Sequence, residues 1–303
     1  MNRRDFTLFS GASLLAAAMP FSLDAQKSRG SLIKKSIPAT AELITAIGMG
    51  SWHTFDVSGT EQELQIRTEI LRLFFEQGGQ FIDSSPMYGS SEKIIGQCLK
   101  NLEGSKSLFS ATKIWTEGED KGIAQMQRSQ KLWGVEQFDL MQIHNLRDWN
   151  THLKTLRRWK ELERVRYIGV TTSHGLRHDQ LIQVLKKEKP DFVQLTYNIN
   201  DREVETRLLP LAQDLGIAVI VNRPFTGLFG RVKDKPLPDY AKEFDCYSWA
   251  QFFLKFVISH PAVTCAIPAT SKIKHMYDNM QAAKGVLPDL KQRQQMLTSF
   301  ETL

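Results

Sequence analysis

The 303-residue sequence has few of the residues that hold small or metal-bound folds together. Its three cysteines, Cys98, Cys246 and Cys265, are far apart and form neither a Cys-x-x-Cys motif nor a Cys/His ligand pattern. We therefore expect no disulfide framework and no metal site. Each cysteine is instead expected to pack as a small apolar side chain.

Long runs of one residue class are also missing. The 39 basic and 33 acidic residues give a formal net charge of +6, but they are interspersed, without the blocks of like charge typical of nucleic-acid-binding arms. No apolar run reaches the roughly 20 residues that a membrane-spanning helix needs. These absences argue against nucleic acid as a partner and against stable membrane insertion.

The first residues of the chain resemble an export signal of the twin-arginine type. Arg3 and Arg4 precede a modestly apolar stretch, residues 7–23, that ends near Ala25. A disordered or amphipathic tail is the alternative, because adjacent arginines are common. The twin-arginine export machinery would be a partner and the periplasm the location, with the cytoplasm as the alternative. The expected division of the chain is a signal segment 1–25, a linker 26–40 and a folded domain 41–303.

From residue 41 onward, short apolar runs alternate with longer segments of helical period, which is typical of repeated βα units. The expected strands are residues 43–48, 80–83, 108–112, 138–144, 167–171, 192–197, 218–222 and 263–268. The expected helices are residues 62–77, 91–101, 123–133, 151–164, 178–187, 205–215, 248–259 and 272–284. A doubly wound sheet would have a Gly-x-Gly-x-x-Gly turn after the first strand, but His53 stands where the third glycine would be. We therefore predict an α/β fold with a single (β/α)8 or TIM barrel.

Polar side chains stand at the ends of the second, third and fourth expected strands. Asp83 ends the second strand, Tyr88 lies in the loop after it, Lys113 follows the third strand and His144 ends the fourth. In such a barrel the carboxyl ends of the strands carry the reactive residues. Each residue alone also has a structural interpretation, as a loop aromatic, an ion pair or a core histidine. Their combination on adjacent strands favours a catalytic site.

These four side chains suit the reduction of a carbonyl group. When a hydride reaches the carbonyl carbon, the oxygen needs a proton, and a tyrosine with an ordinary pKa of about 10 can donate it. Lys113 would lower the pKa of Tyr88, and Asp83 would keep Lys113 charged and in place. His144 would donate a hydrogen bond to the substrate oxygen and orient the carbonyl.

Several segments around these residues resemble the aldo/keto reductase family, in the same order along the chain. Residues 81–89, Phe-Ile-Asp-Ser-Ser-Pro-Met-Tyr-Gly, followed by Ser91 and Glu92, resemble the signature around that family's catalytic aspartate and tyrosine. The other segments are Ala-Thr-Lys at 111–113, Gln-Ile-His at 142–144, Ile-Gly-Val-Thr-Thr at 168–172, Val-Gln-Leu-Thr-Tyr-Asn at 193–198 and Ile-Pro-Ala-Thr-Ser-Lys at 267–272. The resemblance implies an oxidoreductase that moves a hydride between a nicotinamide cofactor and a carbonyl or alcohol.

The resemblance also implies where the cofactor binds. Thr171, Thr172 and Gln194 would bind the nicotinamide carboxamide, and the loop of residues 223–231 would lie along the pyrophosphate. The start of the last helix, with its lysines, suits a 2′-phosphate, which favours NADP(H) over NAD(H). The full implied set is Gly50, Ser51, Trp52, Thr171, Thr172, Gln194, Arg223, Phe225, Gly227, Ser271, Lys272, His275 and Asn279.

The sequence departs from the family's pattern at two positions. Asn222 stands where many members have an aromatic residue that stacks on the nicotinamide, and His275 stands where an arginine often contacts the 2′-phosphate. The alternative function is a cofactor-bound sensor or regulatory subunit with little turnover, because some members of the family look like regulatory subunits. The complete catalytic set favours an enzyme, with a small aldehyde, ketone or sugar, or the matching alcohol, as its substrate.

Overall fold

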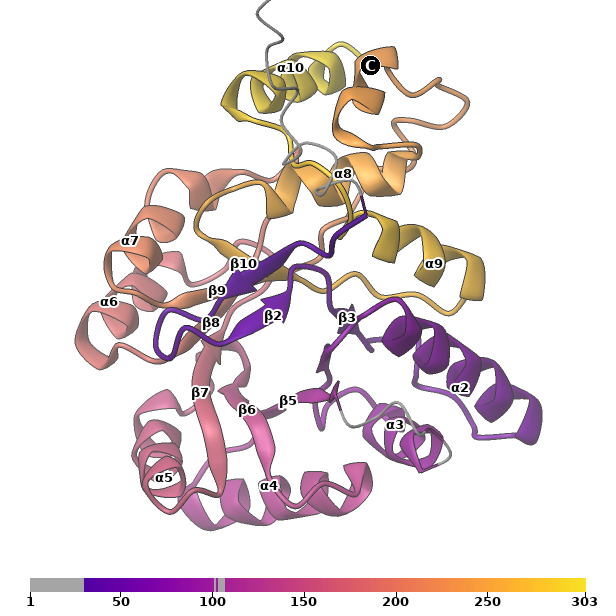
Figure 1. The fold of residues 1–303 in the computed structure, drawn as a ribbon. Coiled ribbons are helices and arrows are strands. Elements are labelled where there is room, and N and C mark those ends of the chain that lie inside the picture. Colours follow the sequence, from indigo (N-terminus) through magenta and orange to yellow (C-terminus); the bar gives the residue numbers. More distant parts are fainter. Residues whose placement is uncertain (1–29, 101, 103–106) are drawn as a thin grey trace, which may run out of the picture.

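The structure, a computed structural model, describes residues 30–100, 102 and 107–303. Within these residues, eight parallel strands form one sheet whose neighbours follow the order of the chain. Parallel bridges from Ile47 to Ala266 and from Gly50 to Ala269 join its first strand to its last. The predicted (β/α)8 barrel is therefore confirmed (Figure 1). The strands are β3 Met49–Gly50, β4 Phe81–Asp83, β5 Phe109–Ile114, β6 Phe138–Ile143, β7 Val165–Thr171, β8 Phe192–Thr196, β9 Ala218–Asn222 and β10 Val263–Ala266.

Helices surround the barrel and connect its strands (Figure 1). The first begins with a capping box between Thr60 and Glu63 and ends just before Gly78, whose φ of +84° favours glycine. The helices are α2 Glu61–Glu76, α3 Ser91–Leu99, α4 Glu119–Trp133, α5 Trp149–Glu161, α6 His178–Glu188, α7 Leu208–Asp214, α8 Trp249–Ile258, α9 Ile273–Gln281 and α10 Leu290–Glu301.

Buried rings form a layer inside the barrel. The rings of Phe81 and Phe109 stack with their centroids 5.1 Å apart, and Tyr167 lies 5.8 Å from Phe109 and 5.5 Å from Phe192. Burying each of these side chains stabilises the fold by roughly 1.5–3 kcal/mol. Because Phe81, Phe109 and Phe192 begin their strands, this layer lies at the amino-terminal end of the barrel and supports the strand ends opposite.

A hairpin that the sequence did not predict covers the amino-terminal end. In it, β1 (Lys34–Ser36) pairs antiparallel with β2 (Leu43–Thr45), and Ile44 joins the layer of rings in one apolar cluster. The predicted single strand 43–48 is therefore right only in its second half: its first residues belong to the hairpin, whereas Ile47 pairs with Ala266 in the barrel and leads into β3. One apolar run belongs to both the hairpin and the barrel: its first residues pack beneath the barrel and its last residues pack inside it. The hairpin also begins inside the predicted linker, while the predicted signal segment lies outside the described residues.

The sequence also did not predict α10, although Asp289 and Gln292 form a capping box at its start. From this helix the buried Arg293 donates to Tyr197 Oη at 2.8 Å and to Ser259 Oγ at 2.7 Å. Arg231, in the loop after β9, donates to the Phe300 backbone oxygen at 3.2 Å. These contacts fix α10 beside that loop (Figure 1).

No helix among the described residues is long and apolar enough to cross a membrane. In the same part of the chain, no group of three or more His, Cys, Asp and Glu side chains is placed to hold a metal ion. All three cysteines are buried, as expected for small apolar side chains.

Candidate active site

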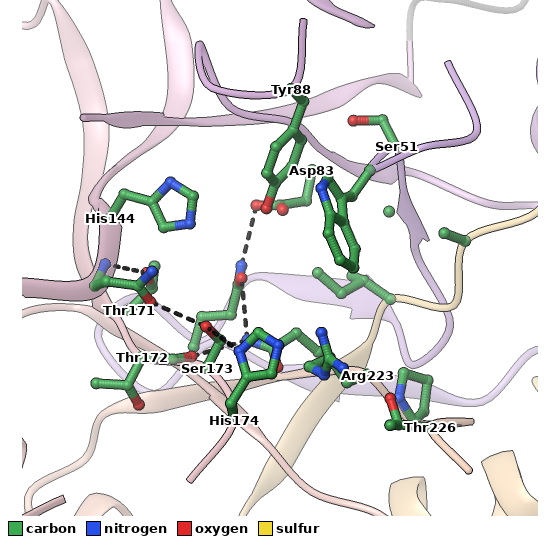
Figure 2. A pocket seen from close by; sticks show the side chains of 18 of the residues that line it. Ser51, Asp83, Tyr88, His144, Thr171, Thr172, Ser173, His174, Arg223 and Thr226 are labelled. Atoms are coloured by element: carbon green, nitrogen blue, oxygen red, sulfur yellow. Dashed lines mark hydrogen bonds between the residues drawn. The ribbon is translucent and has the colours of Figure 1, made fainter. Parts of the chain in front are cut away.

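A cavity of about 390 Å³ opens at the carboxyl ends of the barrel strands (Figure 2). Of the four predicted catalytic residues, Asp83, Tyr88 and His144 line it, and Lys113 contacts it through Asp83. The lining residues are Gly50, Ser51, Trp52, Asp83, Met87, Tyr88, His144, Asn145, Thr171, Thr172, Ser173, His174, Gln194, Asn222, Arg223, Pro224, Phe225, Thr226, Ile267 and Ala269.

Asp83 and Lys113 form a buried ion pair at the ends of β4 and β5. Lys113 Nζ lies 2.5 Å from Asp83 Oδ2, and Asp83 Oδ1 accepts from the side-chain amides of Gln142 at 2.9 Å and Gln194 at 3.0 Å. Burial acts to lower the pKa of Lys113, but Asp83 and Tyr88 outweigh it and raise that pKa. Lys113 therefore remains an ammonium group, as the sequence predicted.

Tyr88 lies beside this ion pair, with Lys113 Nζ 5.2 Å from the centre of its ring. Burial raises the pKa of Tyr88 and outweighs Lys113, which acts to lower it. We expected Lys113 to lower the pKa of Tyr88. Lys113 does act in that direction, but the net shift is upward, so the expected net lowering is wrong. The neutral phenol is favoured, because the surrounding protein solvates a phenolate poorly. Tyr88 thus holds its proton at neutral pH and can donate it.

The loop that carries Tyr88 is fixed by Asp56. Asp56 Oδ1 accepts from the backbone nitrogen of Ser90 at 2.9 Å and from Ser90 Oγ at 3.0 Å. Gly89, which lies between Tyr88 and Ser90 in the chain, has a φ of +56°, and a Cβ at that position would collide with the Asp56 carboxylate. Glycine is needed here, because both the backbone angle and the close approach exclude a side chain.

His144 faces Tyr88 edge-on, with the two ring centroids 5.8 Å apart. Its Nδ1 lies 3.0 Å from Ser85 Oγ. Burial, and then the charge of Lys113, lowers the pKa of His144 to about 3, so the imidazole is neutral. When Ser85 donates to Nδ1, the ring proton is on Nε2, which can donate to a substrate oxygen.

The end of β7 holds one buried hydroxyl without a partner. Thr171 Oγ1 accepts from the backbone nitrogen of Asn145 at 3.0 Å. Thr172 Oγ1, in contrast, is buried and has no hydrogen-bond partner within the described residues. Because Thr172 lines the cavity, its hydroxyl can bind a polar group of a ligand.

Asn222 ends β9 at the position where the sequence lacks an aromatic residue. Its side chain accepts from Thr196 Oγ1 at 2.7 Å and donates to the Thr172 backbone oxygen at 3.0 Å. The amide of Asn222 is therefore held by its neighbours on both sides. Gln194 is partly used as well, because its Nε2 donates to Asp83.

The remaining predicted cofactor residues fall into two groups. Gly50, Ser51, Trp52, Arg223 and Phe225 line the cavity. The second group lies beyond it: Gly227 is in the loop after β9, Ser271 and Lys272 precede α9, and His275 and Asn279 lie within that helix.

Charge at the start of α9 comes from lysine rather than from His275. Burial, followed by Lys272 and Lys274, lowers the pKa of His275, so the imidazole is uncharged at neutral pH. Both lysines are exposed, next to the first turn of the helix. This end of the helix therefore presents positive charge to solvent.

The cavity also contains residues that the sequence reasoning missed, namely Asn145, Ser173 and His174. A usable signal was present, because each follows within two residues a strand-end residue already singled out, His144 or Thr172. Residues just after a barrel strand lie at the same edge of the barrel as the strand end, so the same pattern predicts them as lining residues.

Comparison with known proteins agrees with this geometry. The model of the aldo/keto reductase family matches residues 46–294. The chain therefore belongs to the aldo/keto reductase family of oxidoreductases. Aldo-keto reductase YhdN of Bacillus subtilis (strain 168) is 28% identical over 207 residues, which are 61% of this chain and 60% of that protein. The NADH-specific methylglyoxal reductase of Escherichia coli (strain K12) is 26% identical over 225 residues, 63% of this chain and 67% of that protein.

Solved structures show the same barrel. The aldo/keto reductase from Klebsiella pneumoniae in complex with NADP and acetate has a TM-score of 0.70 at 21% identity, covering 86% of this chain and 93% of that chain. None of these proteins supports the alternative of a cofactor-bound sensor.

Proposed function

We propose that this protein is an NADP(H)-dependent reductase of small carbonyl compounds, with Tyr88 as the proton donor. The observation that carries the proposal is the convergence of the Asp83–Lys113 ion pair, Tyr88 and His144 on one cavity. If Asp83 and Lys113 served only as a structural ion pair, there would be no reason for a protonated phenol and a neutral imidazole to lie side by side at the cavity wall.

A bound nicotinamide would supply a hydride to the carbonyl carbon. Tyr88 Oη donates its proton to the carbonyl oxygen as the double bond becomes single, and the resulting phenolate is stabilised by the Lys113 ammonium. His144 Nε2 donates a hydrogen bond to the same oxygen and sets its direction. In alcohol oxidation the phenolate takes the proton back, so the same residues serve both directions.

The chain also fits the dinucleotide. The unpartnered Thr172 hydroxyl suits the carboxamide of the nicotinamide. Gly227 has a φ of +74° and open space where a Cβ would lie, which allows a phosphate to approach the backbone. Lys272 and Lys274 suit a 2′-phosphate, so we favour NADP(H). A relative named as NADH-specific keeps NAD(H) as the alternative.

Single-turnover oxidation of bound NADPH tests the proposal. The purified protein is loaded with one equivalent of NADPH and mixed with a panel of aldehydes, ketones and sugars, and the absorbance of the reduced cofactor is followed. At least one carbonyl compound is expected to oxidise it. If the protein binds NADPH but no carbonyl compound oxidises it, the chain is not a reductase.

Cofactor preference is expected to depend on Lys272. Lys272→Glu puts a carboxylate beside the proposed 2′-phosphate site and should weaken NADPH binding at least about tenfold more than NADH binding. Titration of the intrinsic fluorescence with each cofactor measures both affinities. Lys121→Glu, an equal charge change at an exposed site on α4, is the control and should change neither. An equal loss for both cofactors in Lys272→Glu would mean that this lysine does not distinguish them.

We further propose that residues 1–25 direct the folded, cofactor-loaded protein to the periplasm through the twin-arginine machinery. Folding before export agrees with three buried, unpaired cysteines, because a chain that folds in a reducing compartment has no need of disulfides. Changing Arg3 and Arg4 to Lys should trap the full-length precursor in the cytoplasm, while the unaltered protein appears outside it, shortened near Ala25. Fractionation and mass measurement that find the same full-length cytoplasmic species for both would exclude export.

A further inference from the structure

Arg223 is held in a position that sends its side chain into the cavity. It follows directly on β9 and has a φ of +54°, a value that residues other than glycine seldom adopt. Its backbone oxygen accepts from Asn198 Nδ2 at 3.2 Å, and Pro224 follows it. The guanidinium carbon lies 5.7 Å from the centre of the Trp52 ring, which also lines the cavity. The strained backbone of Arg223 is thus held in place by its neighbours, and its side chain lies in the cavity.

Arg223 carries a positive charge that the surrounding protein does not neutralise. Within the described residues it forms no salt bridge, although it is half-buried in the cavity lining. The carboxylate of Asp83, which also lines the cavity, is already paired with Lys113 at 2.5 Å. His144 is neutral, so the cavity as a whole has an excess of one positive charge.

Arg147 shows what a neutralised arginine looks like in the same protein. Its guanidinium carbon lies 5.1 Å from the centre of the Trp115 ring, much as Arg223 lies against Trp52. Unlike Arg223, however, Arg147 forms a salt bridge with Glu117 at 3.3 Å, and it does not line the cavity. The lack of a carboxylate beside Arg223 is therefore a local property of the cavity.

Hydrogen-bonding groups surround the guanidinium on the same wall. Figure 2 shows Arg223 and His174 next to one another, across the cavity from Tyr88. Burial, and then the charge of Arg223, lowers the pKa of His174, which keeps this imidazole neutral. Its Nδ1 lies 2.9 Å from Ser173 Oγ, and its backbone nitrogen donates to Thr196 Oγ1 at 3.0 Å. The wall thus offers one fixed cation flanked by neutral polar groups.

We propose that the substrate is a carbonyl compound that also carries a carboxylate, and that Arg223 binds this carboxylate while Tyr88 and His144 hold the carbonyl. This inference rests on the proposed reductase function and names its class of substrate, and it gives Arg223 to the substrate in place of the cofactor contact that the family resemblance implied. A planar guanidinium binds a carboxylate through two parallel hydrogen bonds, and the rings of Trp52 and Phe225 line the same cavity. The amide of Asn222 does not compete for the anion, since its neighbours already hold it.

Matched substrates test the proposal. The values of kcat/KM for 3- and 4-carboxybenzaldehyde are compared with those for the corresponding formylbenzamides, which have nearly the same size but no charge. The wild-type protein should prefer the acids about 10- to 100-fold, as expected for hydrogen bonds to a charged group. In Arg223→Gln the ratio should fall to about one, while Arg223→Lys should keep part of it. The control Arg147→Gln removes an arginine that stacks on tryptophan outside the lining and should leave the ratio unchanged.

A binding measurement separates this proposal from its alternatives. Calorimetric titration of the NADP⁺-loaded protein with benzoate and with benzamide should show that benzoate binds more tightly, and that Arg223→Gln removes the difference. If Arg223→Gln weakens NADPH binding and leaves the ratio of acid to amide unchanged, the guanidinium binds the cofactor pyrophosphate and the proposal is wrong. It is equally wrong if the wild-type protein shows no preference for the acids. If benzoate binds through Arg223 but no aldehyde is reduced, the carboxylate site stands and the reductase function fails.

Discussion

Tyr88→Phe is expected to lower the rate of carbonyl reduction by about 10²- to 10⁴-fold, the usual contribution of a positioned proton donor. The substitution removes only the hydroxyl, so the edge-to-face contact between residue 88 and His144 is kept. Affinity for NADPH should change little, because Tyr88 is not among the residues proposed to bind the cofactor. Single-turnover rates and fluorescence titration with NADPH measure the two quantities separately.

The reason for a large effect is the state in which the structure holds Tyr88. Burial keeps the phenol protonated, and the ammonium of Lys113, 5.2 Å from the ring centre, is placed to stabilise the phenolate that proton transfer leaves behind. A phenylalanine has neither the proton nor the developing charge. Tyr240→Phe is a matched control, since it removes a hydroxyl that donates to Ser299 Oγ at 2.9 Å, away from the cavity. Normal turnover in Tyr88→Phe would show that the proton comes from another group.

Much of the fold could be predicted because the barrel repeats one local pattern. Each strand is a short apolar run followed by a helix of clear period, and seven of the expected strands overlap strands β4 to β10. The hairpin of β1 and β2 could not be separated from the first strand, because Ile44 and Ile47 are both buried and belong to one continuous apolar run. A residue buried beneath the barrel and a residue buried within it are both apolar, so the sequence pattern does not distinguish the two positions.

The site was predictable to the extent that it lies at strand ends. Asp83, Lys113 and His144 were found because the barrel brings consecutive strand ends together. The partners of their side chains could not be read, since Gln142 and Gln194 meet Asp83 only through the closed sheet. The net shift in the pKa of Tyr88 was also missed, because its sign depends on burial, which the position of Lys113 in the sequence does not reveal.

Lys113→Met is expected to lower both stability and activity. Removing one partner of a buried ion pair leaves the other charge uncompensated, which destabilises a protein by about 3–5 kcal/mol. Here Asp83 would keep only its two amide donors, and the Ser84 backbone oxygen would lose the donor that lies 2.8 Å away. Urea unfolding measures the loss of stability. The rate of carbonyl reduction should fall by at least about 10²-fold in the protein that remains folded, because the Tyr88 phenolate loses its nearest cation.

A double variant separates the two roles of Lys113. Asp83→Asn combined with Lys113→Met removes both charges, so much of the lost stability should return, since replacing a buried pair by neutral groups is often close to neutral in free energy. Activity should not return, because the cation beside Tyr88 is still absent. Lys242→Met is the control for the substitution itself: its salt bridge to Asp239, 3.1 Å long, is exposed, and its loss should change the unfolding free energy by at most about 0.5 kcal/mol. If the double variant regained activity together with stability, Lys113 would be a structural residue, and the proton transfer would not depend on its charge.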